Sequence, residues 1–253
     1  MTVMLTPTRR RGVEILDDPS QNPALAVRSL RDVALANRLF GGRRAILREL
    51  RGLVKRALDQ HEASNRATRK RTPTSDVTIT LLDIGTGLGD IPLAAARETD
   101  QVGVRLLTIG LELSPAIAKA AESACSYVVV GDSLRLPFAD DSVDIVTCSQ
   151  VLHHFDGAAA ERLLRECQRV ARVGIVIGEL QRSWLAVAGL WCASFLLGFH
   201  PVSRHDGIVS ILRGFTSPEL HRLVRRVTGA RVRVHRHLGW RVTATWNPAS
   251  AIE

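Results

Sequence analysis

A chain of 253 residues with 45% hydrophobic content can bury one large core and carry an appended element without disulfides or a structural metal. Its four cysteines lack C-x-x-C spacing, which argues against a disulfide framework and a zinc site and favours a reducing cytoplasm. The net charge of +9 resides on the flanks, because residues 76–182 hold 9 Lys and Arg against 15 Asp and Glu. Basic flanks suit anionic substrates, phospholipid or RNA, and a solvated arginine-rich helix face accounts for them equally well.

Residues 1–75 are expected to form a helical extension followed by a linker. Asn22-Pro23 has the pattern of a helix cap and first turn, and Gly41-Gly42 ends that helix. A second helix is predicted from Arg43 to about Glu62, because its apolar residues recur at helical spacing with arginines opposite. A polar linker is predicted over 63–75. The arginines near the start have no apolar stretch behind them, so neither secretion nor organelle import is expected.

Residues 76–253 are expected to form an α/β domain, and its most informative segment is LLDIGTGLGD at 81–90. A β-branched apolar strand leads here directly into three glycines and then into a predicted helix from Ile91, capped by Asp90. Glycines at these positions let the backbone approach a ligand and adopt positive φ. Asp90 occupies the third position of the G-x-G-x-x-G/A pattern, where a dinucleotide-binding fold has a small residue, and its carboxylate would repel a pyrophosphate. The spacing therefore disfavours NAD and favours a cationic cofactor, S-adenosylmethionine.

Further acidic residues follow at the ends of the next predicted strands. Glu112 ends a strand over 106–113 and can take both hydroxyls of a ribose. Asp132 follows a short strand at 127–130 and can accept from an adenine amino group. A fourth strand is predicted over 143–148. Three acidic residues lie in the turn before this strand and at its start: Asp140, Asp141 and Asp144. They are interpreted as a solvated turn rather than as a metal site.

Together these segments make residues 77–182 resemble the class I S-adenosylmethionine-dependent methyltransferases, within the small-molecule branch that includes ubiquinone and menaquinone biosynthesis methyltransferases. LLDIGTGLGD is similar to the first motif of that family, GLELSP to its acidic second-strand end, and GDSLRLPFADDSVDIVTCSQVLHHF to its adenine segment and fourth strand. The resemblance implies a Rossmann-like, seven-stranded, mostly parallel sheet whose last strand is antiparallel. It implies that Asp83 supports the amino group of the cofactor through the loop, that Glu112 binds ribose and that Asp132 binds adenine.

The predicted cofactor-binding residues are Asp83, Gly85, Thr86, Gly87, Gly89, Glu112, Leu113, Asp132, Ser133 and Gln150. The resemblance also places Gln150, Val151 and His153 at the methyl-transfer cleft.

A fifth strand is predicted over 173–177, and the segment 183–216 after it is expected to form a helical lid between strands five and six. Its uncharged, mostly apolar run from Trp184 to Phe199 predicts a helix about 24 Å long, short of the roughly 30 Å hydrocarbon core of a bilayer. We expect this helix to cover an apolar pocket, with a membrane interface or a dimer contact as alternatives. Four aromatic side chains are expected to offer contact area to an aromatic or prenylated substrate: Trp184, Trp191, Phe195 and Phe199.

The fold is expected to close with a helix that Ser217-Pro218-Glu219 caps, that runs to about Thr228 and that Gly229 ends. Two alternating segments, 230–237 and 241–246, predict a terminal hairpin after it.

These patterns predict methyl transfer from S-adenosylmethionine to a small apolar acceptor, through a hydroxyl of an aromatic or polyketide-like molecule. A histidine is the natural proton acceptor for such a hydroxyl, and His153 and His205 are the main candidates, with His154 a third. C-methylation of a quinone precursor is the nearest alternative. RNA methylation is a further one, disfavoured because the TCSQ run at 147–150 matches neither the amino-methylating nor the cytosine-carbon pattern. An inactive cofactor-binding subunit is disfavoured because no expected cofactor acid is missing.

Overall fold

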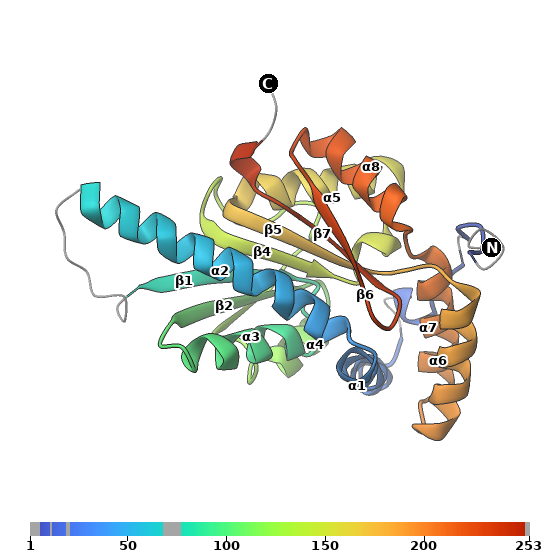
Figure 1. Ribbon diagram of the computed structural model, residues 1–253. Coiled ribbons are helices and arrows are strands. Elements are labelled where there is room, and N and C mark those ends of the chain that lie inside the picture. Colours follow the sequence, from blue (N-terminus) through green and yellow to red (C-terminus); the bar gives the residue numbers. More distant parts are fainter. Residues whose placement is uncertain (1–5, 11, 19–20, 68–76, 251–253) are drawn as a thin grey trace.

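The core of the protein is a seven-stranded sheet of order β3-β2-β1-β4-β5-β7-β6 (Figure 1). The structure, a computed structural model, describes residues 6–10, 12–18, 21–67 and 77–250. Strands β1 to β5 pair in parallel, β7 pairs antiparallel with β5, and β6 pairs antiparallel with β7. The strands are β1 (Thr78–Ile84), β2 (Arg105–Glu112), β3 (Tyr127–Val130), β4 (Val143–Ser149), β5 (Ala171–Leu180), β6 (Arg233–His237) and β7 (Arg241–Trp246). The predicted sheet and its terminal hairpin are confirmed.

The order of the strands fixes where a ligand can bind. The chain builds outward from β1 through β2 to β3 and then returns to the other side of β1 with β4 and β5. The loops after β1 and β4 therefore diverge, which opens a crevice at the carboxyl ends of these neighbouring strands. Both the glycine loop and the residues after Ser149 lie at this edge of the sheet.

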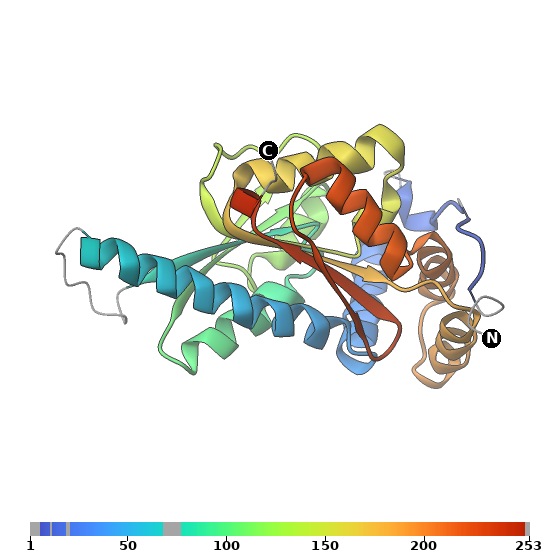
Figure 2. The same cartoon turned by 45° about the horizontal axis from the view of Figure 1, so that its top comes forward.

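Helices cover both faces of the sheet (Figures 1 and 2). On one face, α2 (Gly42–Ala67) and α3 (Asp90–Asp100) pack on β1, β2 and β4 through a buried apolar cluster. On the other face lie α5 (Gly157–Val170) and α8 (Ser217–Thr228). The inward side of α5 carries a helical repeat of buried residues, namely Ala160, Leu163, Leu164, Cys167 and Val170. Short helices α4 (Pro115–Ala121), η4 (Leu152–His154) and η5 (Pro248–Ser250) complete the domain.

The N-terminal extension contains η2 (Ile15–Asp17), α1 (Pro23–Leu39) and α2. The side chain of Asn22 accepts a hydrogen bond of 2.9 Å from the backbone N–H of Ala24, as expected of a cap. The linker prediction is wrong at its start, because α2 continues to Ala67. No proline or glycine interrupts 63–67, and extending a formed helix needs only one further hydrogen bond per residue. The rest of the predicted linker, 68–75, lies outside the described residues.

The predicted lid consists of two helices, α6 (Trp184–Leu196) and α7 (Pro201–Arg213), at the carboxyl edge of the sheet beside α1 (Figures 1 and 2). Helix α6 ends three residues before the predicted Phe199, because Gly198 adopts a φ of 66° and turns the chain. Its 13 residues correspond to about 20 Å. Within the described part of the chain, no helix combines the length and the apolarity needed to cross a bilayer.

Three local predictions need correction. Gly89 occupies the cap position of α3, and Asp90 is the first helical residue and gives no side-chain cap. Thr216, one residue earlier than predicted, caps α8 in a reciprocal capping box with Glu219. Asp144 is not part of a solvated turn, because it is buried, accepts two hydrogen bonds of 2.8 Å from Thr80 and pairs with Arg172 at 2.9 Å.

Candidate active site

The glycine loop after β1 is held tightly against the neighbouring strand. The N–H groups of Gly85 and Thr86 donate to the carbonyl of Leu111 at 2.9 and 3.1 Å. Gly85, Gly87 and Gly89 have φ values of 65°, 56° and 73°, as the sequence predicted. A Cβ on Gly89 would lie 2.7 Å from the Cβ of Ala124, so this glycine also allows close packing of the loop. The loop is therefore a fixed backbone surface.

Asp83 supports this loop from behind. Its side chain is 2% exposed and accepts hydrogen bonds from the hydroxyls of Thr86 at 2.9 Å and Thr147 at 2.6 Å. Burial raises the pKa of this carboxyl to about 7 against the opposing effect of the two hydrogen bonds. Asp83 does not reach the cavity described below, so its contact with a ligand would pass through the loop.

Two further acids stand at the ends of the next strands. Glu112 ends β2, and its carboxylate accepts from the N–H of Gly87 at 3.1 Å and from its neighbour Leu113 at 2.9 Å. Asp132 follows β3 and accepts from the N–H of Leu134 at 2.8 Å. Both carboxylates are thus oriented by backbone donors. They line the same cavity as the glycine loop.

This cavity measures about 760 Å³, within the usual range for small-molecule sites. Three of the predicted cofactor residues, Asp83, Thr86 and Gly89, lie behind its wall. The other seven line it: Gly85, Gly87, Glu112, Leu113, Asp132, Ser133 and Gln150.

The opposite wall of the cavity is apolar and comes from the helical lid and the N-terminal extension. Its side chains include Leu30 and Val33 of α1, Leu190 of α6, Phe199 after α6 and Ile211 of α7. The aromatic residues of the lid are placed differently from the prediction, because only Phe199 lines the cavity. The other three lie on the outer side of α6: Trp184, Trp191 and Phe195. A helix that is apolar all round gives no sequence signal for its inner face.

Gln150 connects the end of β4 to the N-terminal extension. It has a φ of 57°, which is rare for a residue other than glycine. Its backbone N–H donates to the carbonyl of Gly178 at 2.8 Å, and its side-chain amide donates to the Asn37 side chain at 2.7 Å. A strained conformation of this kind is typical of functional sites.

His153 is fully buried in the wall of the cavity. Its Nδ1 forms a hydrogen bond of 2.8 Å with Glu179 at the end of β5, and its backbone N–H donates to the same carboxylate. Its Nε2 has no hydrogen-bond partner among the described residues and lies 3.7 Å from Oε1 of Glu14. The sequence pointed to His153, but it gave no signal for Glu14 or Glu179.

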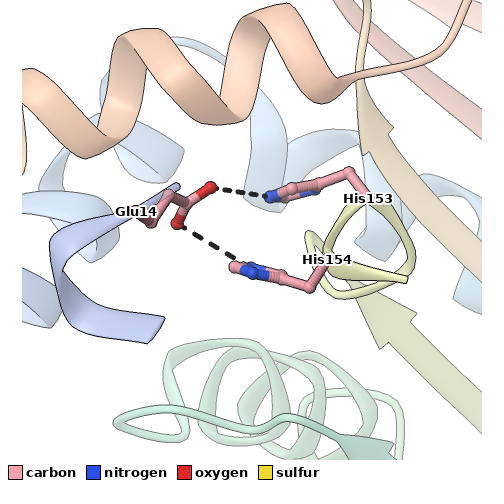
Figure 3. Close-up of side chains that lie close together, drawn as sticks. All are labelled: Glu14, His153 and His154. Atoms are coloured by element: carbon pink, nitrogen blue, oxygen red, sulfur yellow. Dashed lines mark ion pairs between the residues drawn. The ribbon is translucent and has the colours of Figure 1, made fainter. Parts of the chain in front are cut away.

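His154 stacks on His153 with 4.4 Å between ring centroids (Figure 3). Its Nδ1 bonds to Asp17 at 3.0 Å, and its Nε2 lies 4.0 Å from Oε2 of Glu14. Burial works against protonation of this imidazole, and the hydrogen bond with Asp17 together with the charge of Glu14 outweighs it, so the pKa of His154 is raised.

His205 is placed outside this group. Its Nδ1 pairs with its neighbour Asp206 at 2.8 Å, its side chain is half exposed, and it is not among the residues that line the cavity. Asp206 is buried and lines the cavity, where its carboxylate accepts from the N–H groups of Ile15 and Leu16. The N-terminal segment is therefore fastened to α7 across the site.

Known proteins with similar sequences are methyltransferases. A family profile described as "Methyltransferase domain" matches residues 82–177. The demethylmenaquinone methyltransferase of Deinococcus radiodurans is 31% identical over 183 residues, covering 66% of this chain and 73% of that protein. The demethylmenaquinone methyltransferase of Roseiflexus sp. is 35% identical over 44% of this chain, and the match spans 47% of its own length.

Among solved structures, the CMeT domain of the citrinin polyketide synthase superposes with a TM-score of 0.52 at 15% identity. That match covers 76% of this chain and 52% of the other. At this identity the likeness concerns the fold alone.

Proposed function

This chain belongs to the class I S-adenosylmethionine-dependent methyltransferases, and we propose that it transfers a methyl group from S-adenosylmethionine to a hydroxyl of a small apolar, aromatic or polyketide-like acceptor. One observation carries the proposal. A single cavity extends from the glycine loop and its acids to the apolar wall formed by α1, α6 and α7. Such a cavity has room for a nucleoside donor at one end and an apolar acceptor at the other.

The residues of the donor end fit S-adenosylmethionine. Gly87 lines the cavity, and within 4 Å a Cβ on it would meet only the Leu30 side chain, at 3.6 Å, so this backbone can be approached by a ligand. Glu112 and Asp132 offer carboxylates for ribose hydroxyls and for the adenine amino group. Asp83 steadies the loop through Thr86. The bound cofactor would supply a methyl group already activated by a positively charged sulfur.

At the acceptor end, the lid contributes by excluding water and by aligning the acceptor. Holding two reactants in line can lower a barrier by about 7 to 11 kcal/mol. The apolar lining favours an acceptor with an aromatic or aliphatic body.

His153 is the proposed proton acceptor. Glu179 holds Nδ1, so Nε2 of the neutral ring carries the lone pair. His153 lines the cavity, and its Nε2 is buried without a hydrogen-bond partner among the described residues. Glu179 acts as a positioning residue. His205 pairs with Asp206 but does not itself line the cavity, and it is the less suitable candidate.

C-methylation of a quinone precursor is the second candidate, favoured by the similarity to demethylmenaquinone methyltransferases. Removing a hydroxyl proton also activates the ring carbon of such a precursor, so His153 would serve both reactions.

The deciding experiment is a radiolabelled methyl-transfer assay over phenols, quinols, lipids and RNA, paired with calorimetry of S-adenosylhomocysteine binding. We expect binding of this product and transfer to a phenol or quinol. Binding of NAD in its place, or transfer to RNA alone, would contradict the proposal.

A further inference from the structure

Glu14, His153 and His154 form a cluster whose geometry suits a metal ion. One ligand atom from each residue lies within 4.8 Å of the other two. Figure 3 shows the carboxylate of Glu14 reaching from the N-terminal segment toward both imidazole rings, which project together from the loop after β4. Two imidazoles and one carboxylate are a ligand set typical of divalent first-row transition metals.

Both imidazoles are held in the orientation that metal binding requires. The Nδ1 of His153 bonds to Glu179, and the Nδ1 of His154 bonds to Asp17. In the neutral form of each ring, the carboxylate favours the proton on Nδ1 and leaves the lone pair on Nε2, and both Nε2 atoms face Glu14. A carboxylate behind a histidine is the usual outer-shell partner in metal sites. A single histidine–carboxylate pair can serve only to satisfy a buried ring, but two pairs that converge on one carboxylate point to a shared ion.

The distances require only a small contraction. Metal bonds to imidazole nitrogen and carboxylate oxygen are about 2.0 to 2.2 Å long, which places two ligand atoms of a tetrahedral ion roughly 3.3 Å apart. Nε2 of His153 lies 3.7 Å and Nε2 of His154 lies 4.0 Å from an oxygen of Glu14. Because all three ligand atoms lie within 4.8 Å of one another, contractions of at most about 1.5 Å would close the site. The side chain of His153 is 1% exposed and that of Glu14 is 8% exposed, so bulk water competes little for these atoms.

Nearby charges narrow the choice of ion. Arg213 lies 3.2 Å from Oε1 of Glu14 and 2.8 Å from Asp17, and the hydroxyl of Ser210 donates to the same Oε1 at 2.8 Å. Among the described residues Oε2 accepts no hydrogen bond, so its lone pairs are the ones available to an ion. A guanidinium beside a single carboxylate ligand is unfavourable for Mg²⁺ and Ca²⁺, which need several oxygen ligands. The two nitrogen ligands instead favour Zn²⁺, Co²⁺, Mn²⁺ or Fe²⁺.

We infer that Glu14, His153 and His154 bind a divalent transition-metal ion in the wall of the acceptor cavity. All three residues line this cavity, so three protein ligands leave a coordination position open toward it. If the proposed function is correct, an acceptor hydroxyl would occupy that position. The ion would lower the pKa of the hydroxyl so that its proton passes to solvent, and Nε2 of His153 would then be a ligand instead of the proton acceptor.

The test is a titration of chelator-treated, metal-free protein with Co²⁺, followed by calorimetry and by visible absorption. We expect one Co²⁺ per chain, with visible d–d bands and without a near-ultraviolet sulfur-to-cobalt band. His154→Ala and Glu14→Gln should each weaken binding at least tenfold, and Asp17→Asn by 10- to 100-fold. His205→Ala is the matched control, because it removes another histidine paired with a carboxylate and should leave binding unchanged.

Three outcomes would overturn the inference: no stoichiometric binding, equal binding by wild type and both ligand variants, or a thiolate band that points to the exposed Cys192. Because the His154 side chain is 31% exposed, His154→Ala is expected to fold even if Glu14→Gln does not, and circular dichroism checks this. Binding of S-adenosylhomocysteine by the same samples tests the donor site separately. Loss of that binding would count against the proposed function and not against the metal site.

Discussion

The substitution Asp83→Asn tests how burial at the glycine loop affects the stability of the fold. Asp83 lies beneath the loop, and its two hydrogen-bond donors are the hydroxyls of Thr86 and Thr147. Burial, assisted by the charges of Asp90 and Glu112, raises the pKa of this carboxyl to about 7. Asn has the same shape, accepts from Thr147 through its carbonyl and donates to Thr86 once that hydroxyl rotates.

The sign and size of the effect follow from linkage. In the unfolded chain this carboxyl titrates near 3.8, so between about pH 4 and pH 7 the folded protein keeps a proton that the unfolded chain has lost. The free energy of unfolding therefore falls as the pH rises through this window. A pKa difference of about 3 corresponds to about 4 kcal/mol above pH 7, of which roughly 2 to 3 kcal/mol is lost between pH 5 and pH 8.

Urea unfolding of the ligand-free protein at pH 5 and pH 8 measures this loss. We expect Asp83→Asn to remove about 2 to 3 kcal/mol of the pH-dependent loss seen in the wild type. Thr147→Val should make the dependence steeper, because it deletes a hydrogen bond that stabilises the ionised form. The same pH dependence in wild type and Asp83→Asn would show that burial does not hold a proton on this carboxyl, and the reasoning would fail.

Three further predictions concern the loop, the donor and the proton. Gly89→Ala should lower the free energy of unfolding, measured by heat or urea, by about 2 to 4 kcal/mol, because the φ of this residue is positive and the new Cβ would meet Ala124. The control Gly52→Ala lies inside α2 with open space around it and should raise the free energy of unfolding by about 0.5 to 1 kcal/mol. Equal effects of the two substitutions would contradict this packing argument. Glu112→Ala should weaken S-adenosylhomocysteine binding about tenfold or more in calorimetry, and an unchanged affinity would remove Glu112 from the donor site. His153→Ala should slow methyl transfer about 10²-fold or more with donor affinity preserved, whereas equal turnover by His153→Ala and His205→Ala at every pH would exclude a histidine base.

Much of the donor half could be predicted from the sequence, because its signals are local. The strand pattern, the glycine spacing and the acids at strand ends each occupy a few consecutive residues, and a parallel sheet brings the carboxyl ends of its strands to one edge. Seven of the ten predicted cofactor residues line the cavity for this reason. Asp83 and Thr86 belong to the same sequence motif but lie behind the loop, outside the cavity. A sequence motif does not show which of its residues line a cavity.

The acceptor half could not be predicted in the same way, because its contacts join distant parts of the chain. Glu14 faces His153 because α7 holds the N-terminal segment: Asp206 accepts hydrogen bonds from the backbone of Ile15 and Leu16, and Ser210 and Arg213 bind the Glu14 carboxylate. No periodicity near Glu14 carries that information. The inner face of α6 was equally hidden, since its apolar residues surround the whole helix, and packing against α7 decides which of them line the cavity.

The difference between the donor end and the acceptor end of the cavity also determines what the likeness to known proteins means for function. The matching family profile covers residues 82–177, which include the glycine loop, Glu112, Asp132 and His153. It stops before Glu179 and excludes Glu14, Asp206 and the whole lid. The profile therefore contains the residues proposed to bind the donor, while Glu14, Glu179 and the lid lie outside it, although the 183-residue match to the Deinococcus radiodurans protein extends beyond the profile. The proposed role of the N-terminal segment and α7 at the acceptor is tested directly by variants of these segments. A variant there should change KM for the acceptor and leave donor affinity intact, because no residue of either segment touches the glycine loop through a hydrogen bond in the described part of the chain.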